Sequence, residues 1–114
     1  MIDFACKSFK LERVIRCGLG LTIADFKVLE FLLKQDKELD TKDIAAGITV
    51  NLSTVQRAVK KLAEKELIQR RQENLDDGGY LFYYSIRSKQ HIRNMIMQIV
   101  NAWVKKVDTE LRKW

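Results

Sequence analysis

The chain has 114 residues, of which 46% are hydrophobic and 32% are charged. This length and composition are typical of one soluble globular domain with an apolar core. The formal net charge of +6 favours an anionic partner. No apolar run approaches the roughly 18 residues of a membrane span, and two cysteines are too few for a secreted disulfide scaffold. We therefore expect a single domain over residues 1–114, in a cytoplasmic protein with no membrane partner.

Two helices are expected in the first third of the chain. Ser8 is placed to cap a helix over residues 9–18, which the Gly18-Leu19-Gly20 break would end. Thr22 and Asp25 form a weaker relative of the capping box before a helix over residues 23–35. The apolar residues of this second helix recur with a helical period at Phe26, Leu29, Leu32 and Leu33.

A short helix, a turn and a longer basic helix follow. Leu39-Asp40 is expected to be a short strand, after which Thr41 caps a helix over residues 42–46 that Gly47 ends. Asn51 or Ser53 then caps a helix over residues 52–65. The apolar residues of this helix are spaced by three and four, at Leu52, Val55, Val59 and Leu62. This spacing places them on one face and leaves a polar face opposite.

Two strands and a long helix complete the chain. The first strand runs over residues 67–75, the tip is Asp76-Asp77-Gly78-Gly79, and residues 80–86 return as an alternating strand. Ser88 then caps a helix over residues 89–112, which would be about 35 Å long. Its apolar stripe consists of Ile92, Ile96, Ile99, Trp103, Val107 and Leu111.

A helix-turn-helix followed by a β-hairpin is the plan of a winged-helix domain. We therefore expect a mainly α fold with a small β-hairpin wing and a core over residues 22–87. The last helix is longer than so small a domain can cover, so part of its stripe should face a second subunit. We expect the helices over residues 9–18 and 89–112 to form a homodimer through that stripe and Phe9.

Three segments resemble a known family: LTIADFKVLEFLL, DIAAGITVNLSTVQRAVKKLAEKELIQRR and GGYLFYYSI. From Leu19 to Ile86 the chain resembles the archaeal TrmB-like branch of the MarR-type winged-helix transcriptional regulators. The resemblance implies a homodimer that binds operator DNA and regulates transcription. It also implies that residues 52–65 are the recognition helix and residues 67–86 the wing.

The basic surplus coincides with this expected recognition helix. Residues 51–72 contain six Lys/Arg and two acidic residues, a net charge of +4. We expect Arg57 and Gln56 to read guanine and adenine edges in duplex DNA, and Lys60 and Lys61 to contact phosphates. The other expected DNA-binding residues are Lys42, Ser53, Thr54, Arg70 and Arg71, although at most one of the two adjacent arginines points toward DNA because they alternate along a strand.

A protein–protein adaptor in a transcription assembly, with the same fold but no base readout, is the alternative. The acidic tip Asp76-Asp77 favours it, because phosphates repel carboxylates at close range.

The remaining candidates for chemistry are sparse. Cys6 and Cys17 are eleven residues apart, and we expect structural burial, with redox sensing or an intermolecular disulfide as alternatives. One histidine, His91, is too few for a metal site with these cysteines. The sequence contains no catalytic constellation, so we expect neither an enzyme nor a cofactor.

Overall fold

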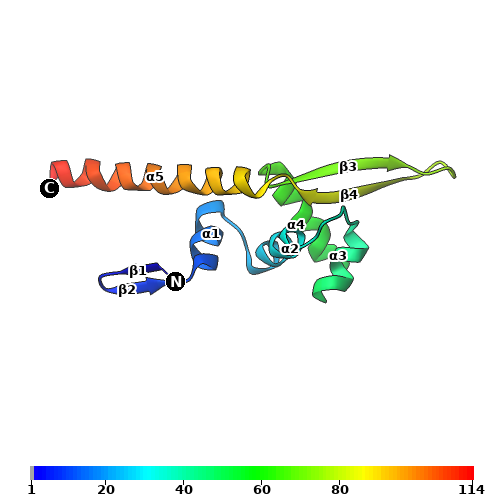
Figure 1. Cartoon of the computed structure of the whole chain (residues 1–114), viewed down its shortest axis with the longest axis horizontal. Helices are drawn as coiled ribbons and strands as arrows, with labels where there is room; N and C mark the ends of the chain where they lie inside the picture. Colours follow the sequence, from blue (N-terminus) through cyan, green and yellow to red (C-terminus); the bar gives the residue numbers. More distant parts are fainter. Residues whose placement is uncertain (1) are drawn as a thin grey trace.

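The computed structural model describes residues 2–114, which form five helices and two antiparallel β-hairpins. The elements are β1 (Ile2–Phe4), β2 (Lys7–Phe9), α1 (Leu11–Leu19), α2 (Ile23–Leu33), α3 (Thr41–Ile48), α4 (Leu52–Glu64), β3 (Ile68–Asn74), β4 (Tyr80–Ile86) and α5 (Lys89–Lys113). The fold is a winged helix-turn-helix, mainly α with a β-hairpin wing, as the sequence predicts. The molecule measures 66 × 23 × 23 Å, because α5 and the wing project in opposite directions from the helical core (Figure 1).

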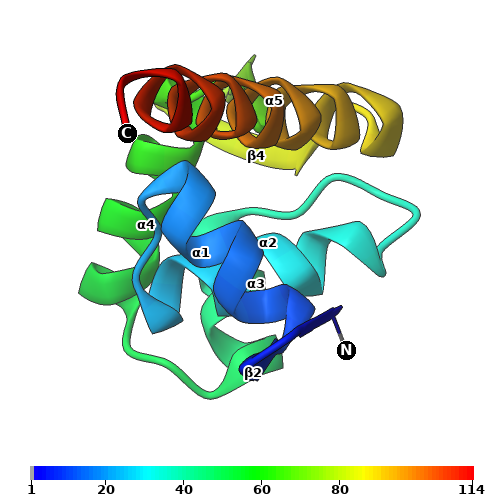
Figure 2. The same cartoon turned by 90° about the vertical axis from the view of Figure 1, so that its left-hand side faces the viewer.

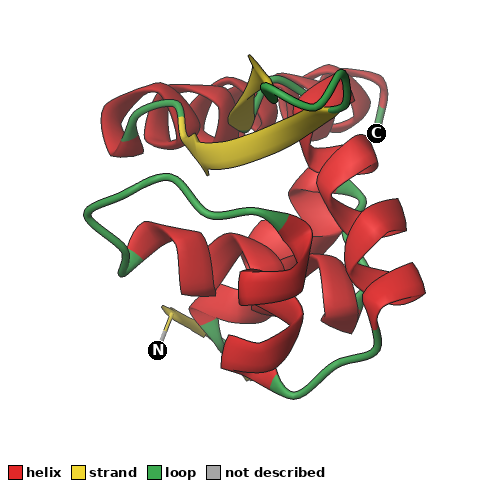
Figure 3. Cartoon of the chain, turned by 90° about the vertical axis from the view of Figure 1, so that its right-hand side faces the viewer, coloured by secondary structure: helices red, strands yellow, loops and turns green. Residues whose placement is uncertain are grey.

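The core lies among α2, α3 and α4. End-on views place these helices on one side of the molecule, and α5 and β4 on the other (Figures 2 and 3). The largest fully buried side chains are Val28, Leu29, Leu32, Ile44, Val55, Val59, Leu62 and Leu67. Leu67 immediately precedes β3, so the wing is joined directly to this core. Within residues 2–114, no helix is both long and apolar enough to cross a membrane.

The wing is a regular hairpin attached to the core at its base. Ile68 pairs with Ile86 and Asn74 with Tyr80, so all seven residues of β3 face a partner on β4. Leu39 adds an isolated bridge to Tyr84 on the outer edge of β4. The expected short strand at Leu39-Asp40 is therefore reduced to one bridging residue.

The N-terminal prediction was wrong in one respect. Residues 2–9 form the β1–β2 hairpin, in which Ser8 faces Asp3 and donates its hydroxyl hydrogen to that carboxylate. Ser8 is therefore unavailable as a cap, and α1 begins at Leu11 without a side-chain cap hydrogen bond from Lys10. The helix spans 11–19 rather than 9–18 because Lys7–Phe9 forms strand β2, which pairs with β1.

The caps of α2, α4 and α5 are confirmed, whereas those of α3 differ from expectation. Thr22 and Asp25 form a reciprocal capping box, and Asn51 and Ser88 each cap the helix that follows. For α3, the carboxylate of Asp40 accepts the capping hydrogen bond, so Thr41 lies inside the helix.

Gly47 also lies inside α3 rather than at its end. A Cβ atom at this position would lie 2.4 Å from Cζ of Phe31, so the glycine permits close contact between α3 and α2. The helix ends one residue after Gly47, at Ile48, and Thr49 adopts a left-handed conformation with φ 56°.

Candidate nucleic-acid interface

Helix α4 has one buried and one exposed face. Asn51 fixes its start, because Asn51 Oδ1 accepts a hydrogen bond from the Thr54 N–H at 2.9 Å. Val55, Val59 and Leu62 turn inward, as the spacing of apolar residues predicts, whereas Leu52 is largely exposed. The predicted DNA-binding residues on the exposed face are Ser53, Gln56, Arg57 and Lys60.

Three of these side chains are free to meet a ligand. In the described part of the chain, Gln56, Arg57 and Lys60 form no hydrogen bond or ion pair with another residue. Ser53 is less free, because its hydroxyl donates to Asn51 Oδ1 at 2.9 Å. Thr54 is half-buried beside the cap. The exposed donors therefore concentrate one turn into the helix, at Gln56 and Arg57.

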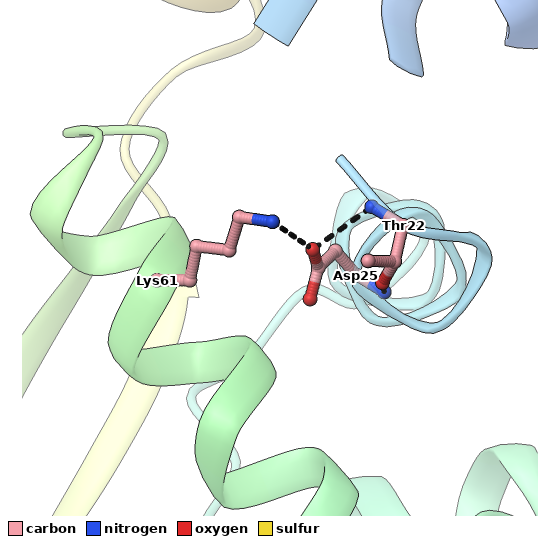
Figure 4. A network of polar contacts seen from close by, with 3 residues as sticks. All are labelled: Thr22, Asp25 and Lys61. Carbon is pink, nitrogen blue, oxygen red and sulfur yellow. Dashed lines mark hydrogen bonds and ion pairs between the residues drawn. The ribbon is translucent and has the colours of Figure 1, made fainter. Parts of the chain in front are cut away.

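Lys61 departs from the expected arrangement. Its Nζ lies 2.8 Å from Oδ2 of Asp25, on α2, so its ammonium points into the protein (Figure 4). The same carboxylate accepts the Thr22 N–H at 2.9 Å. Burial raises the pKa of Asp25, but the hydrogen bonds from Lys61 and Thr22 outweigh burial, so this pKa lies below its ordinary value of 3.8. The prediction overlooked a buried carboxylate 36 residues away, and it grouped Lys61 with Lys60 by sequence alone.

Arg70 and Arg71 occupy opposite faces of β3, as alternation predicts. The guanidinium of Arg70 lies over the Phe82 ring, 4.3 Å from its centroid. Arg71 instead donates from Nε to both carboxylate oxygens of Glu38, at 2.9 and 3.0 Å. It also lies over Tyr83, 5.0 Å from the ring centroid. Arg71 therefore ties the wing to the loop before α3.

A groove of about 680 Å³ separates α4 from the wing. It is lined by Gln56, Lys60, Ala63, Glu64, Ile68, Arg70, Phe82 and Tyr84. Lys60 stands on the helix wall and Arg70 on the wing wall, with Glu64 as the single carboxylate among the lining residues. The groove thus brings together predicted residues from two elements, with two cations against one anion.

The aromatic lining of the groove was not predicted as part of the site. Phe82 supports the Arg70 guanidinium, and Tyr80 packs edge-on against Phe82 with ring centroids 5.2 Å apart. Burial raises the pKa of the Tyr84 phenol, while the neighbouring Arg70 charge opposes that rise. The alternation of residues 80–86 was a usable signal, since it places these three aromatic residues on one face with Arg70.

Two further features lie outside the groove. Lys42 is exposed near the start of α3. Asp76 and Asp77 are exposed at the wing tip, where Gly78 has φ 93° and the Leu75 N–H donates to the Gly79 carbonyl at 2.7 Å. Figure 1 shows this tip at the end of the wing that lies farthest from α4.

The predicted dimer residues fall into two groups. Ile92 is buried, and Ile96 and Phe9 are half-buried, within the protein's own fold. The others are exposed and lie farther along α5: Ile99, Trp103, Val107 and Leu111. The start of the stripe therefore packs against the core of the protomer, and the rest of the stripe is exposed.

Both cysteines are free and exposed, contrary to the expected burial. Cys6 lies in the β1–β2 turn and Cys17 on α1. Across residues 2–114, no group of three or more His, Cys, Asp and Glu side chains is arranged to hold a metal ion.

Comparisons with known proteins agree with this fold. A protein of Methanocaldococcus jannaschii, MJ1503, is 30% identical over 114 residues, covering 100% of this chain and 83% of that protein. The structure of a possible transcriptional regulator from Methanosarcina mazei is 50% identical with a TM-score of 0.93, covering 100% of this chain and 96% of that one.

A more distant structure shares the fold. It is the homodimeric winged helix-turn-helix DNA-binding domain Mb0332 from Mycobacterium bovis, 20% identical with a TM-score of 0.53, covering 86% of this chain and 78% of that one. A family model described as the DnaD N-terminal domain matches residues 9–107. The chain therefore belongs to the DnaD N-terminal domain family.

Proposed function

We propose that this protein is a transcriptional regulator that binds specific sequences in double-stranded DNA as a homodimer. The observation that carries the proposal is the groove between α4 and the wing, which is lined by Gln56 and Lys60 from α4 and by Arg70 from the wing, with Arg57 exposed beside it on α4. The Methanosarcina mazei structure, 50% identical over the whole chain, is described as a possible transcriptional regulator. This likeness supports the same role here.

The roles of the groove residues, and of Arg57 on the same exposed face of α4, follow from their chemistry. Arg57 suits bidentate recognition of guanine, and Gln56 suits adenine, each contact contributing about 1–3 kcal/mol of discrimination. Lys60 and Arg70 suit phosphates, which orient the protein without reading sequence. Lys42, Ser53 and Thr54 are secondary candidates at the rim. Lys61 and Arg71 are assigned to holding the fold together, because their cationic groups already contact Asp25 and Glu38.

In a homodimer, the α4 helices of the two protomers would bind the same DNA site together. Two copies related by a two-fold axis would place their α4 helices in successive major grooves, about 10 bp apart on a pseudo-palindromic site. The exposed part of α5 supplies an apolar surface for such pairing. We also propose a TrmB-like, non-enzymatic regulator that acts in the cytoplasm, on the basis of the three resembling segments and the fold.

The adaptor alternative rests on one observation, the exposed carboxylates of Asp76 and Asp77. Binding through the tip would select a basic protein surface and would leave the α4 face unused. DNA titrations therefore separate the two functions.

The test is fluorescence anisotropy with duplexes selected from a genomic pool and a scrambled duplex, at several salt concentrations. We expect log K to fall steeply with log salt. Arg57→Ala should lower the preference for the selected duplex by roughly 5- to 150-fold. Lys60→Ala should weaken both duplexes alike and reduce the salt slope by about 1 per protomer.

Lys105→Ala is the matched control, since it removes one exposed positive charge from the far part of α5. It should leave preference and slope unchanged. If Arg57→Ala and Lys60→Ala both behave like Lys105→Ala, the α4 face does not bind DNA and the proposal fails.

A further inference from the structure

The outer half of α5 presents an apolar face that the rest of the protomer leaves uncovered. Every residue from 101 to 114 is exposed. The exposed fractions are 58% for Trp103, 38% for Val107, 59% for Leu111 and 99% for Trp114. The successive spacings of 4, 4 and 3 residues place all four side chains on one side of the helix. Figure 1 shows this half of α5 extending beyond α1.

An apolar groove lies at the base of that face, in the corner between α1 and α5. Its volume is about 490 Å³, and it is lined chiefly by Phe9, Val14, Cys17, Ile99, Val100 and Trp103. The two helices approach closely there, since a Cβ atom on Gly18 would lie 3.8 Å from a methyl group of Ile99. Helix α1 therefore blocks any second helix that runs along this face toward the start of α5.

The exposed face is complementary to a second copy of itself. Consider an antiparallel pair of α5 helices with its two-fold axis beside Val107. A residue on the apolar face then lies level with the partner residue that is equally far from Val107 in the opposite direction along the chain. Val107 then meets the partner's Val107, and Trp103 meets the partner's Leu111. Val100 lies level with the partner's Trp114, so that indole reaches the corner groove. Every central contact joins two apolar side chains.

The charges beside the face fit the same arrangement. Lys106 and Glu110 both border the shallow surface formed by Trp103, Val107, Leu111 and Trp114. In residues 2–114 neither of the two forms an ion pair. Around an axis at Val107, Lys106 and the partner's Glu110 border the same side of the seam and differ by two residues in level, about 3 Å along the helix, which a lysine side chain can span, and the pairing occurs twice.

Another register fits less well. An axis at Trp103 would bring Leu111 of one copy level with Met95 of the other. Met95 is half-buried and packs on the protomer's own core. In the Val107 register the partner's Trp114 lies level with Val100 and so reaches only as far as the α1–α5 groove.

We infer that two copies of this chain pair through antiparallel α5 helices about an axis beside Val107, with the partner's Trp114 seated in the α1–α5 groove. This interface specifies how the homodimer of the proposed function is built, and rests on that homodimer.

Disulfide cross-linking tests the axis directly. Packed helices lie about 8–10 Å apart with Cα atoms about 2.3 Å from each axis, so facing Cα atoms are roughly 3.5–5.5 Å apart, a range that overlaps the Cα separation of a disulfide. In a background with Cys6→Ser and Cys17→Ser, Val107→Cys should form a covalent dimer rapidly under mild oxidation. Lys105→Cys, on the opposite face of α5, is the matched control and should stay monomeric in denaturing gels.

Charge reversal provides a second measurement, by analytical ultracentrifugation of the full chain. Glu110→Lys should weaken dimerisation several-fold, and adding Lys106→Glu should restore it by recreating both pairs. A dimer in which Val107→Cys and Lys105→Cys cross-link equally, or in which the double reversal fails to recover, overturns this register but leaves the proposed function intact. A monomer at all concentrations overturns the register and the homodimer together, while the DNA titrations still decide the DNA-binding role.

Discussion

Replacing Lys61 with methionine should destabilise the protein without reducing its electrostatic attraction to DNA. Methionine retains an unbranched, apolar stem, so the substitution mainly removes the ammonium group. That group lies 2.8 Å from Oδ2 of Asp25, whose side chain is only 8% exposed. The Lys60 ammonium, one residue earlier, has no such partner and lines the groove beside the wing.

The magnitude follows from the geometry of the pair. A hydrogen bond to a charged group contributes about 1.5–3 kcal/mol to stability. The Lys61 side chain is 37% exposed, and solvent screening of such a pair lowers its contribution. We therefore expect Lys61→Met to cost about 1–2 kcal/mol, which lowers the Tm of a protein of this size by roughly 4–8 °C.

A double-mutant cycle with Asp25→Asn isolates the pair from packing changes. Thermal unfolding of wild type, both single variants and the double variant should give a coupling energy of about 1 kcal/mol. A value below about 0.3 kcal/mol, the usual scatter for independent sites, would refute the interaction. In DNA titrations, Lys61→Met should keep the wild-type salt slope, whereas Lys60→Met should lower it by about 1 per protomer.

The pH dependence provides an independent check on Asp25. Its pKa in the folded protein is below 3.8, so the ionised carboxylate contributes stability that is present above its ordinary pKa and is lost as the pH falls through the lowered value. The stability difference between wild type and Asp25→Asn should therefore be constant from about pH 7 to pH 5 and shrink below about pH 4.

Three further predictions follow from local features of the structure. Arg70→Ala should weaken DNA binding and its salt dependence, whereas Arg71→Ala should leave DNA binding unchanged in the same titration, because Glu38 already holds that side chain. Gly47→Ala should cost about 1–3 kcal/mol by overpacking against Phe31, measured by urea unfolding; Gly79→Ala is its control, because no neighbouring atom lies closer than 3.7 Å to a Cβ atom there. Thr49→Gly should raise the Tm slightly. The substitution relieves the strain of a left-handed threonine, about 1–2 kcal/mol, but the greater conformational entropy of glycine in the unfolded chain offsets up to about 1 kcal/mol of this gain. A lower Tm would show that the threonine side chain makes a compensating contact.

The helix-turn-helix and wing were predictable because local signals specify them. Asn51 caps α4, apolar residues recur every three or four positions along it, and the two glycines at 78–79 mark the hairpin tip. These signals need no knowledge of distant residues. The β1–β2 hairpin lacked comparable signals, since IDFACKSF contains no Gly, Pro or Asn at its turn, and Ser8 is equally suited to a cap.

The interface was only partly predictable, because the state of a surface cation depends on residues far along the chain. Asp25 is 36 residues from Lys61, and Glu38 is 33 residues from Arg71. The spacing of residues in the sequence reveals neither of these two contacts. The exposed face of α4 could be identified from periodicity, but which of its charges remain available to a ligand required the packed structure.

In each of the two dibasic pairs, Lys60-Lys61 and Arg70-Arg71, one side chain lines the groove and the other forms an ion pair within the protein. Adjacent side chains differ by about 100° around a helix and about 180° along a strand, so one member of each pair faces the groove and the other points away from it. Lys61 and Arg71 meet carboxylates, while Lys60 and Arg70 remain beside the groove. The net charge of the segment therefore overstates the cations that DNA can meet. Since each phosphate contact adds about 0.9 to the salt slope, these two pairs together should contribute a slope of about 2 per protomer rather than about 4.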